Sequence, residues 1–255
     1  NRARSTREAV SAWFEERGTT ATPSALSEDA VRVGSAATAR SGERESGGAW
    51  WVQSESSAMP VDVLNPQPGE AILDACSGRG NKALQSAARL DGEGSLVCIE
   101  RDARKSSLLE RRLNDAGFYA QILTADATSV DLTRQFDRIL VDAPCSGLGV
   151  LGRHPEARWR KRPDDGERLA ITQRALLDAL APKLNPGGVL VYAVCSTDPR
   201  ETTEVIDWLT RTHDAQRGLM PERCEPFLTE AGDAIVPPGI DGRDGFFIAR
   251  IERSA

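Results

Sequence analysis

From Gly69 onward, short apolar runs alternate with longer stretches that have helical periodicity. The apolar runs are rich in Ile, Val and Leu, and they read "AILDAC", "SLVCIE", "AQILTAD", "FDRILVDA" and "GVLVYAVC". Nearly continuous apolar runs of this length are typical of strands that a parallel sheet buries on both faces. Their alternation with helices predicts a doubly wound α/β fold with a Rossmann-like, mostly parallel sheet. Ligands of such folds bind in the crevice at the carboxyl ends of the strands.

Helices are expected between these strands, at residues 82–90, 103–117, 167–184 and 200–212. The closing stretch "GFFIARIER" predicts a late antiparallel strand at the edge of the sheet. The first 48 residues differ: "SAWFEERG" predicts a helix, "DAVRVG" a short strand and "SGERESGG" a flexible linker. Trp50 and Trp51 are expected to pack in a core or at a junction rather than to stack on bases.

The composition argues against several classes of protein. Five cysteines are widely spaced and form no C-x-x-C pair: Cys76, Cys98, Cys145, Cys195 and Cys224. With only two histidines, this predicts neither a disulfide scaffold nor a metal site, and it suits a reducing cytoplasm. No apolar run approaches the roughly 18 residues that cross a bilayer, so we expect no membrane partner. A thiol remains available as a nucleophile.

Acidic residues follow three successive strands of the predicted sheet. Asp74 and Glu100 end the first and second strands, and Asp126 ends the third. In the crevice these carboxylates could accept hydrogen bonds from ribose hydroxyls and an adenine amino group, which predicts an adenosine-binding edge. The alternative is that each acid caps a helix or a turn. Gly78 and Gly80 let a ligand approach the first turn, although the G-x-G-x-x-G pattern of dinucleotide sites is absent.

An acidic crevice favours a cationic ligand over an anionic one. Dinucleotides carry a pyrophosphate, whereas S-adenosylmethionine carries a sulfonium and an ammonium group. The three acids therefore predict a methyltransferase that uses S-adenosylmethionine, rather than a dehydrogenase.

The fourth and fifth strands each end in a cysteine motif. "DAPCSG" supplies Asp142 and Cys145, and "VCSTDP" supplies Cys195. A thiolate can add to carbon 6 of a pyrimidine, which makes carbon 5 nucleophilic enough to accept a methyl group. An acid near ring nitrogen 3 would stabilise the charge that develops there. One cysteine as nucleophile and a second that helps release would explain both thiols; the alternative is that both are small core residues.

The stretch "RHPEARWRKR" (153–162) is basic, although the chain carries a net charge of −6. It holds five basic residues, one acid and Trp159. Because it follows the first cysteine motif, it predicts a phosphate-binding patch that faces the substrate. The alternative is a solvated loop. The low net charge predicts modest RNA affinity for the chain alone, with a partner domain or a preassembled ribonucleoprotein as substrate.

Together these motifs resemble the RsmB/Sun family of RNA cytosine-5 methyltransferases, from about Trp51 to Arg250. The matching stretches are "WVQSESSAMPVDVLNPQPGEAILDAC", "DAPCSGLGVLGRHPEARWR", "QRALLDALAPKLNPGGVLVYAVCST" and "GFFIARI". The paired P-C and C-S-T motifs are the specific part. DNA cytosine-5 methyltransferases carry their nucleophile in the first motif, as proline-cysteine-glutamine, and lack the second motif.

The resemblance also implies a division of the chain. Residues 49–255 would form the S-adenosylmethionine-dependent catalytic domain, and residues 1–48 a short extension that is interpreted as the remnant of an RNA-binding region. RsmB-type members carry a helical NusB-like domain ahead of the catalytic part. No such pattern is found here, which fits either an excised catalytic domain or a compact member.

The family's roles fall on matching residues of this sequence. Cys195 would be the nucleophile, Cys145 would assist product release, and Asp142 would contact the target base. Lys82 would reach the active site from the first motif. The implied cofactor-binding residues are Asp74, Cys76, Ser77, Gly78, Gly80, Lys82, Glu100, Arg101, Asp126, Ala127 and Asp142.

Two motifs depart from the family pattern. The first motif usually reads close to C-A-A-P-G-G-K-T, whereas here "CSGRGNKA" has Arg79 in place of proline and Asn81 in place of glycine. After the second cysteine motif, "DPRETTE" keeps Glu201 and has Thr202 in place of asparagine. The first departure lies where the methionine part of S-adenosylmethionine would bind. It therefore concerns the affinity for the cofactor rather than the methyl-transfer reaction.

The leading hypothesis is a monomeric enzyme that methylates carbon 5 of a cytosine in RNA, foremost ribosomal RNA. The target would lie in a single strand or loop, because a stacked base cannot be reached. The alternatives are a tRNA substrate, a methyltransferase for another substrate, and a non-catalytic RNA-binding or assembly factor. The presence of both cysteines and Asp142 argues against a non-catalytic factor, because such a protein does not require these residues.

Overall fold

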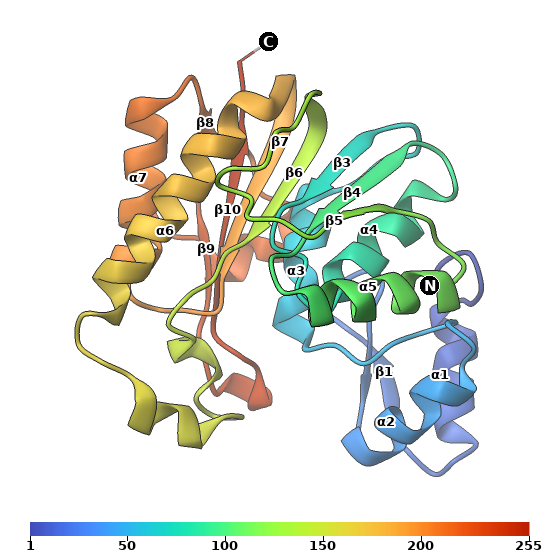
Figure 1. The fold of residues 1–255 in the computed structure, drawn as a ribbon. Coiled ribbons are helices and arrows are strands. Elements are labelled where there is room, and N and C mark those ends of the chain that lie inside the picture. Colours follow the sequence, from blue (N-terminus) through green and yellow to red (C-terminus); the bar gives the residue numbers. More distant parts are fainter. Residues whose placement is uncertain (255) are drawn as a thin grey trace.

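The central sheet contains eight strands, and their order decides which loops can meet (Figure 1). The computed structural model describes residues 1–254. The strands are β3 (Ala71–Asp74), β4 (Ser95–Ile99), β5 (Gln121–Leu123), β6 (Phe136–Asp142), β7 (Leu184–Val194), β8 (Gln216–Arg217), β9 (Ala234–Val236) and β10 (Phe246–Glu252). They lie in the order β5-β4-β3-β6-β7-β10-β8, and β9 also pairs with β10. Strands β3 to β7 run parallel to one another, and β10 is antiparallel to its three partners.

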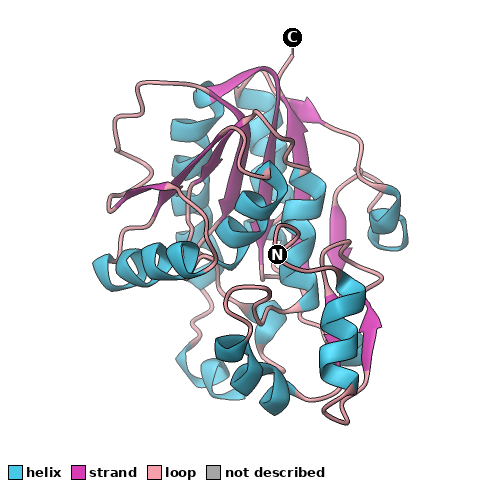
Figure 2. Ribbon diagram, turned by 90° about the vertical axis from the view of Figure 1, so that its right-hand side faces the viewer, coloured by secondary structure: helices cyan, strands magenta, loops and turns pink. Residues whose placement is uncertain are grey.

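Helices cover both faces of the twisted sheet, as Figure 2 shows. One face packs against α3 (Glu55–Leu64), α4 (Asn81–Leu90) and α5 (Ala103–Asp115), and the other against α6 (Asp165–Leu180) and α7 (Thr203–Thr212). Strand residues alternate between two cores, so that Ile72 faces one and Leu73 the other. This arrangement confirms the predicted doubly wound, mostly parallel sheet.

Short 3-10 turns lie in the connections. They are η1 (Leu148–Val150), η2 (Pro155–Arg160), η3 (Ala181–Lys183), η4 (Pro199–Glu201), η5 (Glu222–Phe227) and η6 (Ile240–Gly242). None of the helices within residues 1–254 combines the length and the apolar character that a membrane crossing requires.

The closing strand corrects one prediction. β10 is antiparallel, as predicted, but it does not lie at the edge of the sheet, because β7 flanks it on one side and β8 and β9 on the other. These two flanking strands contain two and three residues, which is too short for a recognisable periodic pattern. They pair with backbone groups of β10 that an edge strand would leave exposed.

The N-terminal residues form a small unit beside the sheet. Its elements are α1 (Arg7–Glu15), the antiparallel pair β1 (Ala21–Pro23) and β2 (Val31–Val33), and α2 (Ala36–Glu45). The predicted flexible linker at 41–48 is wrong, because α2 runs through most of it. Ser35 caps this helix by accepting a hydrogen bond from the Thr38 backbone N–H (3.2 Å). Gly42 fits closely under Trp13, since a Cβ there would lie 2.1 Å from the ring.

Trp50 and Trp51 are partly buried, and each packs against a core, as predicted. The Trp50 ring centroid lies 5.3 Å from that of Trp13 and 5.0 Å from that of Phe14, within the small aromatic core of the N-terminal unit. Trp51 instead packs against the core beneath α3, α4 and α5. The two neighbouring indoles therefore join the N-terminal unit to the sheet.

A buried cation also joins these two parts. Arg89 on α4 lies between Asp29 of the N-terminal unit and Asp62 on α3, and its Nη2 is 2.7 Å from the nearer Asp29 oxygen. The side chains of Arg89 and Asp62 are only 4% and 2% exposed. A charge at such depth is stable only while it is paired, so the three residues depend on one another.

We therefore expect Arg89→Met to lower the free energy of unfolding by about 3–5 kcal/mol, because it leaves the buried Asp62 carboxylate without its cation. Urea unfolding followed by circular dichroism measures this change. Arg168→Met is the matched control: its guanidinium forms an exposed pair with Asp165, and its loss should leave the midpoint nearly unchanged. Equal effects of the two substitutions would contradict a structural role for the buried cluster.

Candidate active site

The reversal of strand order at the centre of the sheet creates the crevice. From β3 the chain winds outward through β4 and β5, whereas β6, on the other side of β3, leads to β7. Asp74 ends β3, Asp142 ends the neighbouring β6, and Cys195 comes directly after the end of β7. Residues from three adjacent parallel strands therefore meet at one edge, at the position where open α/β sheets bind ligands.

The two cysteine motifs come together at this edge. The Sγ atoms of Cys145 and Cys195 lie 3.3 Å apart, within hydrogen-bond distance and longer than the roughly 2.05 Å of a disulfide. The backbone N–H of Gly149 donates to the Cys195 carbonyl (3.0 Å) and closes one loop onto the other. Gly149 has no room for a side chain, because a Cβ would lie 2.2 Å from the Gly245 carbonyl oxygen.

A fully buried carboxylate, that of Glu201, holds these two loops together. Its Oε1 accepts hydrogen bonds from the Ser146 backbone N–H (2.8 Å) and from Gln173 (3.1 Å). Its Oε2 accepts from the hydroxyls of Ser196 (2.6 Å) and Ser146. Each serine follows one of the two cysteines, so a single side chain fixes the separation of the thiols.

Lys82 reaches the same edge from the first turn of α4. Its buried ammonium group donates to Asp142 Oδ2 (2.7 Å) and to Ser57 Oγ (2.9 Å). The Asp142 side chain is 31% exposed and thus open to the crevice. An ion pair with one exposed partner can bind a polar ring on its open side.

The surroundings of the two thiols differ. The hydrogen bond from Cys145 lowers the pKa of Cys195, and the positive charge of Lys82 acts in the same direction. That hydrogen bond, together with burial, raises the pKa of Cys145 well above the ordinary thiol value. Of the two, Cys195 is therefore the thiol that ionises more readily.

Asp74 is a buried acid without a protein partner. It is 1% exposed, and neither carboxylate oxygen accepts a hydrogen bond from a described side chain or backbone group. Burial, and next the negative charge of Asp142, raise the pKa of Asp74 to about 7. Unpaired buried oxygens of this kind fit a ligand that donates hydrogen bonds or carries positive charge. S-adenosylmethionine meets that requirement.

Glu100 and Asp126 are engaged differently from Asp74. Glu100 accepts hydrogen bonds from the backbone N–H groups of Gly78 (2.9 Å) and Asp102 (2.8 Å), and each oxygen keeps room for a second donor. The exposed Asp126 accepts from the backbone and hydroxyl of Thr128 through one oxygen, and the backbone bond lowers its pKa. Both acids therefore cap turns, which is the alternative raised for all three acids, and both retain the capacity to accept further hydrogen bonds.

The remaining residues of the expected cofactor site lie around the first turn. Gly78 has φ +58°, and a Cβ there would meet no atom within 4 Å, so this turn is open. Gly80 has φ +89° and faces Leu109 of α5 at close range, so its lack of a side chain serves packing. Burial raises the pKa of the Cys76 thiol, and the nearby acids add to this effect.

The other expected cofactor residues differ in exposure. Ser77 donates to the backbone carbonyl of Asp74 (2.9 Å). Ala127 is buried in the core beneath α6 and α7, and Arg101 lies exposed after β4. Cys98 and Cys224 are fully buried in the core beneath α3, α4 and α5. No group of His, Cys, Asp or Glu side chains within residues 1–254 is arranged to hold a metal ion.

The two residues that depart from the first motif, Arg79 and Asn81, both contact α5. Asn81 accepts a hydrogen bond from Arg112 (2.5 Å) through its side-chain oxygen, and Arg112 also donates to the Arg79 carbonyl (2.8 Å). The Arg79 side chain itself is exposed. Both substituted residues thus take part in a contact between the first turn and α5.

Sequence reasoning missed two supporting residues. Ser57, which accepts a hydrogen bond from Lys82, lies in the stretch ahead of the first predicted strand, where no motif indicates its role. Glu201 was noted only as a retained motif residue, although the serine after each cysteine could have indicated a shared partner.

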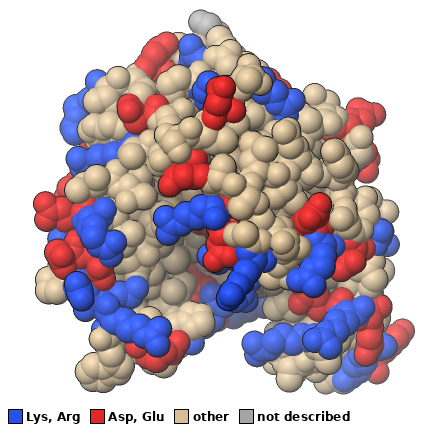
Figure 3. All heavy atoms as spheres, in the orientation of Figure 1, with Lys and Arg blue, Asp and Glu red and all other residues tan. Residues whose placement is uncertain are grey.

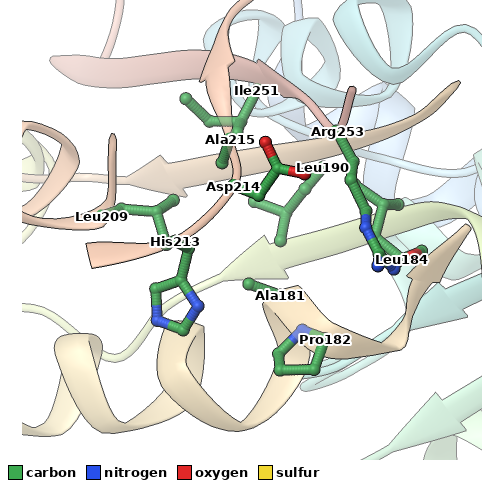
Figure 4. Close-up of a pocket in the computed structure, with 10 residues that line it drawn as sticks. All are labelled: Ala181, Pro182, Leu184, Leu190, Leu209, His213, Asp214, Ala215, Ile251 and Arg253. Atoms are coloured by element: carbon green, nitrogen blue, oxygen red, sulfur yellow. Dashed lines mark hydrogen bonds between the residues drawn. The ribbon is translucent and has the colours of Figure 1, made fainter. Parts of the chain in front are cut away.

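A pocket of about 200 Å³ lies elsewhere, and Figure 4 shows the residues around it. It includes Leu184, which begins β7, whereas Cys195 follows the last residue of that strand. At about 3.3 Å per residue, the two ends of β7 are about 30 Å apart. The pocket is therefore not part of the crevice.

The comparisons with known proteins agree on one family. The family model described as 16S rRNA methyltransferase RsmB/F matches residues 61–252. Ribosomal RNA small subunit methyltransferase B of Vibrio cholerae is 35% identical over 257 residues, which cover 99% of this chain and 57% of the relative. The Probable ribosomal RNA small subunit methyltransferase B of Bacillus subtilis is 36% identical over 212 residues, with 79% and 47% covered. This chain thus spans about half the length of these relatives.

A solved structure extends the likeness to the fold. The crystal structure of NSun6 from Pyrococcus horikoshii with SFG has a TM-score of 0.75 at 25% identity, and the match covers 89% of this chain and 60% of that chain. The family model spans the sheet from α3 to β10, and the Vibrio cholerae relative aligns with nearly the whole sequence. With both cysteine motifs brought to one crevice, this chain belongs to the RsmB/F family of 16S rRNA methyltransferases.

Proposed function

We propose that this chain transfers a methyl group from S-adenosylmethionine to carbon 5 of a cytosine in ribosomal RNA, through a covalent bond between Cys195 and the base. The observation that carries the proposal is the thiol pair: a Cys195 sulfur with lowered pKa, 3.3 Å from a protonated Cys145. The family description and both curated relatives support ribosomal RNA of the small subunit as the substrate.

The residues at the carboxyl ends of β3, β4 and β5 would hold the cofactor. The unpaired Asp74 carboxylate suits its cationic part, and Glu100 suits the ribose hydroxyls. Asp126 would accept from the adenine amino group. When bound, S-adenosylmethionine supplies an activated methyl group next to the thiol pair.

The protein's own residues then divide the remaining chemistry. The Cys195 thiolate forms a bond to carbon 6 of the cytosine, and the electrons of the 5,6 double bond become available at carbon 5. Lys82 and Asp142 face the polar edge of the ring: the ammonium group stabilises the negative charge that develops there, and the free carboxylate oxygen accepts from the 4-amino group.

Release requires the reverse of addition. After methylation, a base removes the carbon-5 proton, the 5,6 double bond forms again, and the bond from carbon 6 to sulfur breaks. The departing sulfur carries the electron pair as a thiolate. Cys145, which keeps its proton, donates a hydrogen bond to this thiolate and so stabilises the leaving group.

We expect Cys145→Ala to accumulate a protein–RNA adduct, because the departing Cys195 thiolate loses its hydrogen-bond donor. The variant is incubated with S-adenosylmethionine and unmodified small-subunit ribosomal RNA, and the adduct appears as a retarded band on a denaturing gel. The double variant Cys145→Ala/Cys195→Ala should give no band, and the core variant Cys224→Ala should behave as the unchanged chain. A band that persists without Cys195 would falsify the assignment of the nucleophile.

The pKa shift of Cys195 predicts its reactivity. We expect iodoacetamide to alkylate Cys195 at a lower pH than an ordinary cysteine, since the thiolate is the reacting form. Both Lys82→Met and Cys145→Ala should move the pH profile of alkylation to higher pH, because each removes an interaction that favours the thiolate. Peptide mass spectrometry measures the profile, and Lys183→Met, remote from the crevice, serves as control. Unchanged profiles in both variants would contradict the proposed activation.

A further inference from the structure

A basic segment lies beside the crevice, and the proposed methyl transfer does not use it. We call residues 153–162, which include η2, the basic platform. The side chains of Arg158, Arg160 and Arg162 form no ion pair or hydrogen bond with any of residues 1–254. Between them, Trp159 is 84% exposed. Lys and Arg side chains gather at the lower left of Figure 3, over the segment that Figure 1 draws in yellow-green.

The platform is fixed to the catalytic loops at its base. Lys161 donates a hydrogen bond to the backbone carbonyl of Ser146, the residue after Cys145. Arg153 pairs with the buried Asp244, on the loop that contacts Gly149. Since two residues span at most about 7 Å, Trp159 is separated from the backbone beside Cys145 by two residues and one lysine side chain.

The surface around the basic platform shows where a long substrate can lie. The carboxyl ends of the parallel strands point toward the lower half of Figure 1, where the platform lies on one side and α1 and α2 on the other. Figure 3 shows the surface hollowed between these two parts. A strand that places one base at the thiol pair would leave this hollow beside the platform.

The residue types of the platform match one kind of partner. Unpaired arginines next to an exposed indole favour a polyanion that also offers flat aromatic faces, which a single-stranded nucleic acid does. In a loop that contacts only solvent, an exposed indole is unfavourable, because its apolar surface is hydrated rather than buried. A duplex keeps its bases stacked inside and has no face for Trp159.

We propose that the basic platform binds single-stranded RNA next to the target nucleotide, with Trp159 stacked on a neighbouring base and Arg158, Arg160 and Arg162 on phosphates. The inference rests on the proposed function, because the target nucleotide is the one held at Cys195. It adds a substrate-binding surface within this chain and a preference for unpaired RNA around the modified base.

Fluorescence anisotropy with the chain and a labelled single-stranded RNA of about a dozen nucleotides tests the stacking contact. We expect Trp159→Ala to weaken binding by about 5- to 150-fold at every salt concentration, without a change in salt dependence. Tyr119→Ala, which removes an equally exposed aromatic ring from the connection between α5 and β5, should leave binding unchanged. Thermal unfolding of each variant confirms that it is folded.

The same titrations at several salt concentrations test the phosphate contacts. The triple variant Arg158→Ala/Arg160→Ala/Arg162→Ala should reduce the slope of log affinity against log salt by about 2, the amount expected when three phosphate contacts to a single strand are lost. An RNA duplex of the same length should bind the unchanged chain more weakly than the single strand and should not respond to Trp159→Ala.

Three outcomes of the RNA titrations would overturn the proposal: equal binding by Trp159→Ala and the unchanged chain, equal binding of duplex and single strand, or no RNA binding at all. Binding of a polyglutamate peptide in place of RNA would assign the platform to an acidic protein and also overturn it. A probe without cytosine separates this inference from the proposed function. It should still bind through the platform, whereas the Cys195 adduct requires cytosine.

Discussion

The hydrogen bonds of the Glu201 carboxylate are the constraint on which the arrangement of the site depends. The two cysteines lie 50 residues apart in sequence, on loops that follow different strands. Parallel pairing of β6 with β7 brings those loops to the same edge, but pairing alone leaves their tips free to move. Glu201 binds the serine after each cysteine, and it is fully buried while doing so. The distance between the thiols, and with it the difference in their protonation, follows from this one side chain.

The strand order places the two halves of the proposed reaction next to each other. Asp74 and Asp142 end neighbouring strands, so the negative charge of Asp142 adds to burial in raising the pKa of Asp74. Lys82 lies between the two functions, since it pairs with Asp142, opposes the rise in the pKa of Asp74 and favours the ionised form of Cys195. A single ammonium group thus balances an acidic ligand pocket against a thiol that has to ionise. One side chain can act on both groups only at the point where the strand order of the sheet reverses.

Much of the fold could be predicted from sequence, because buried parallel strands leave apolar runs and their carboxyl ends share one edge. The same logic predicts that Asp142, Cys145 and Cys195 meet in one crevice, as they do in the structure. Pairs of two or three residues such as β8 and β9 carry no periodic signal, so the position of β10 inside the sheet could not be inferred. The helix at 36–45 was hidden by its glycine and serine content, because packing against Trp13 decides its conformation there. Hydrogen-bond partners such as Ser57 depend on side-chain placement, which local patterns do not encode.

The cluster of Arg89, Asp29 and Asp62 limits which substitutions this sequence can tolerate at these three positions. Loss of Arg89 leaves the buried Asp62 without its cation, and loss of Asp62 leaves the buried Arg89 with Asp29 as its remaining acid, so these single substitutions are disfavoured. The three positions belong to the N-terminal unit, α3 and α4, so they are distant in sequence and coupled in space. In an alignment of relatives they should therefore vary as a set, with the cation and its acids retained or replaced together. Covariation at these positions would then mark the descent of the N-terminal unit together with the methyltransferase sheet.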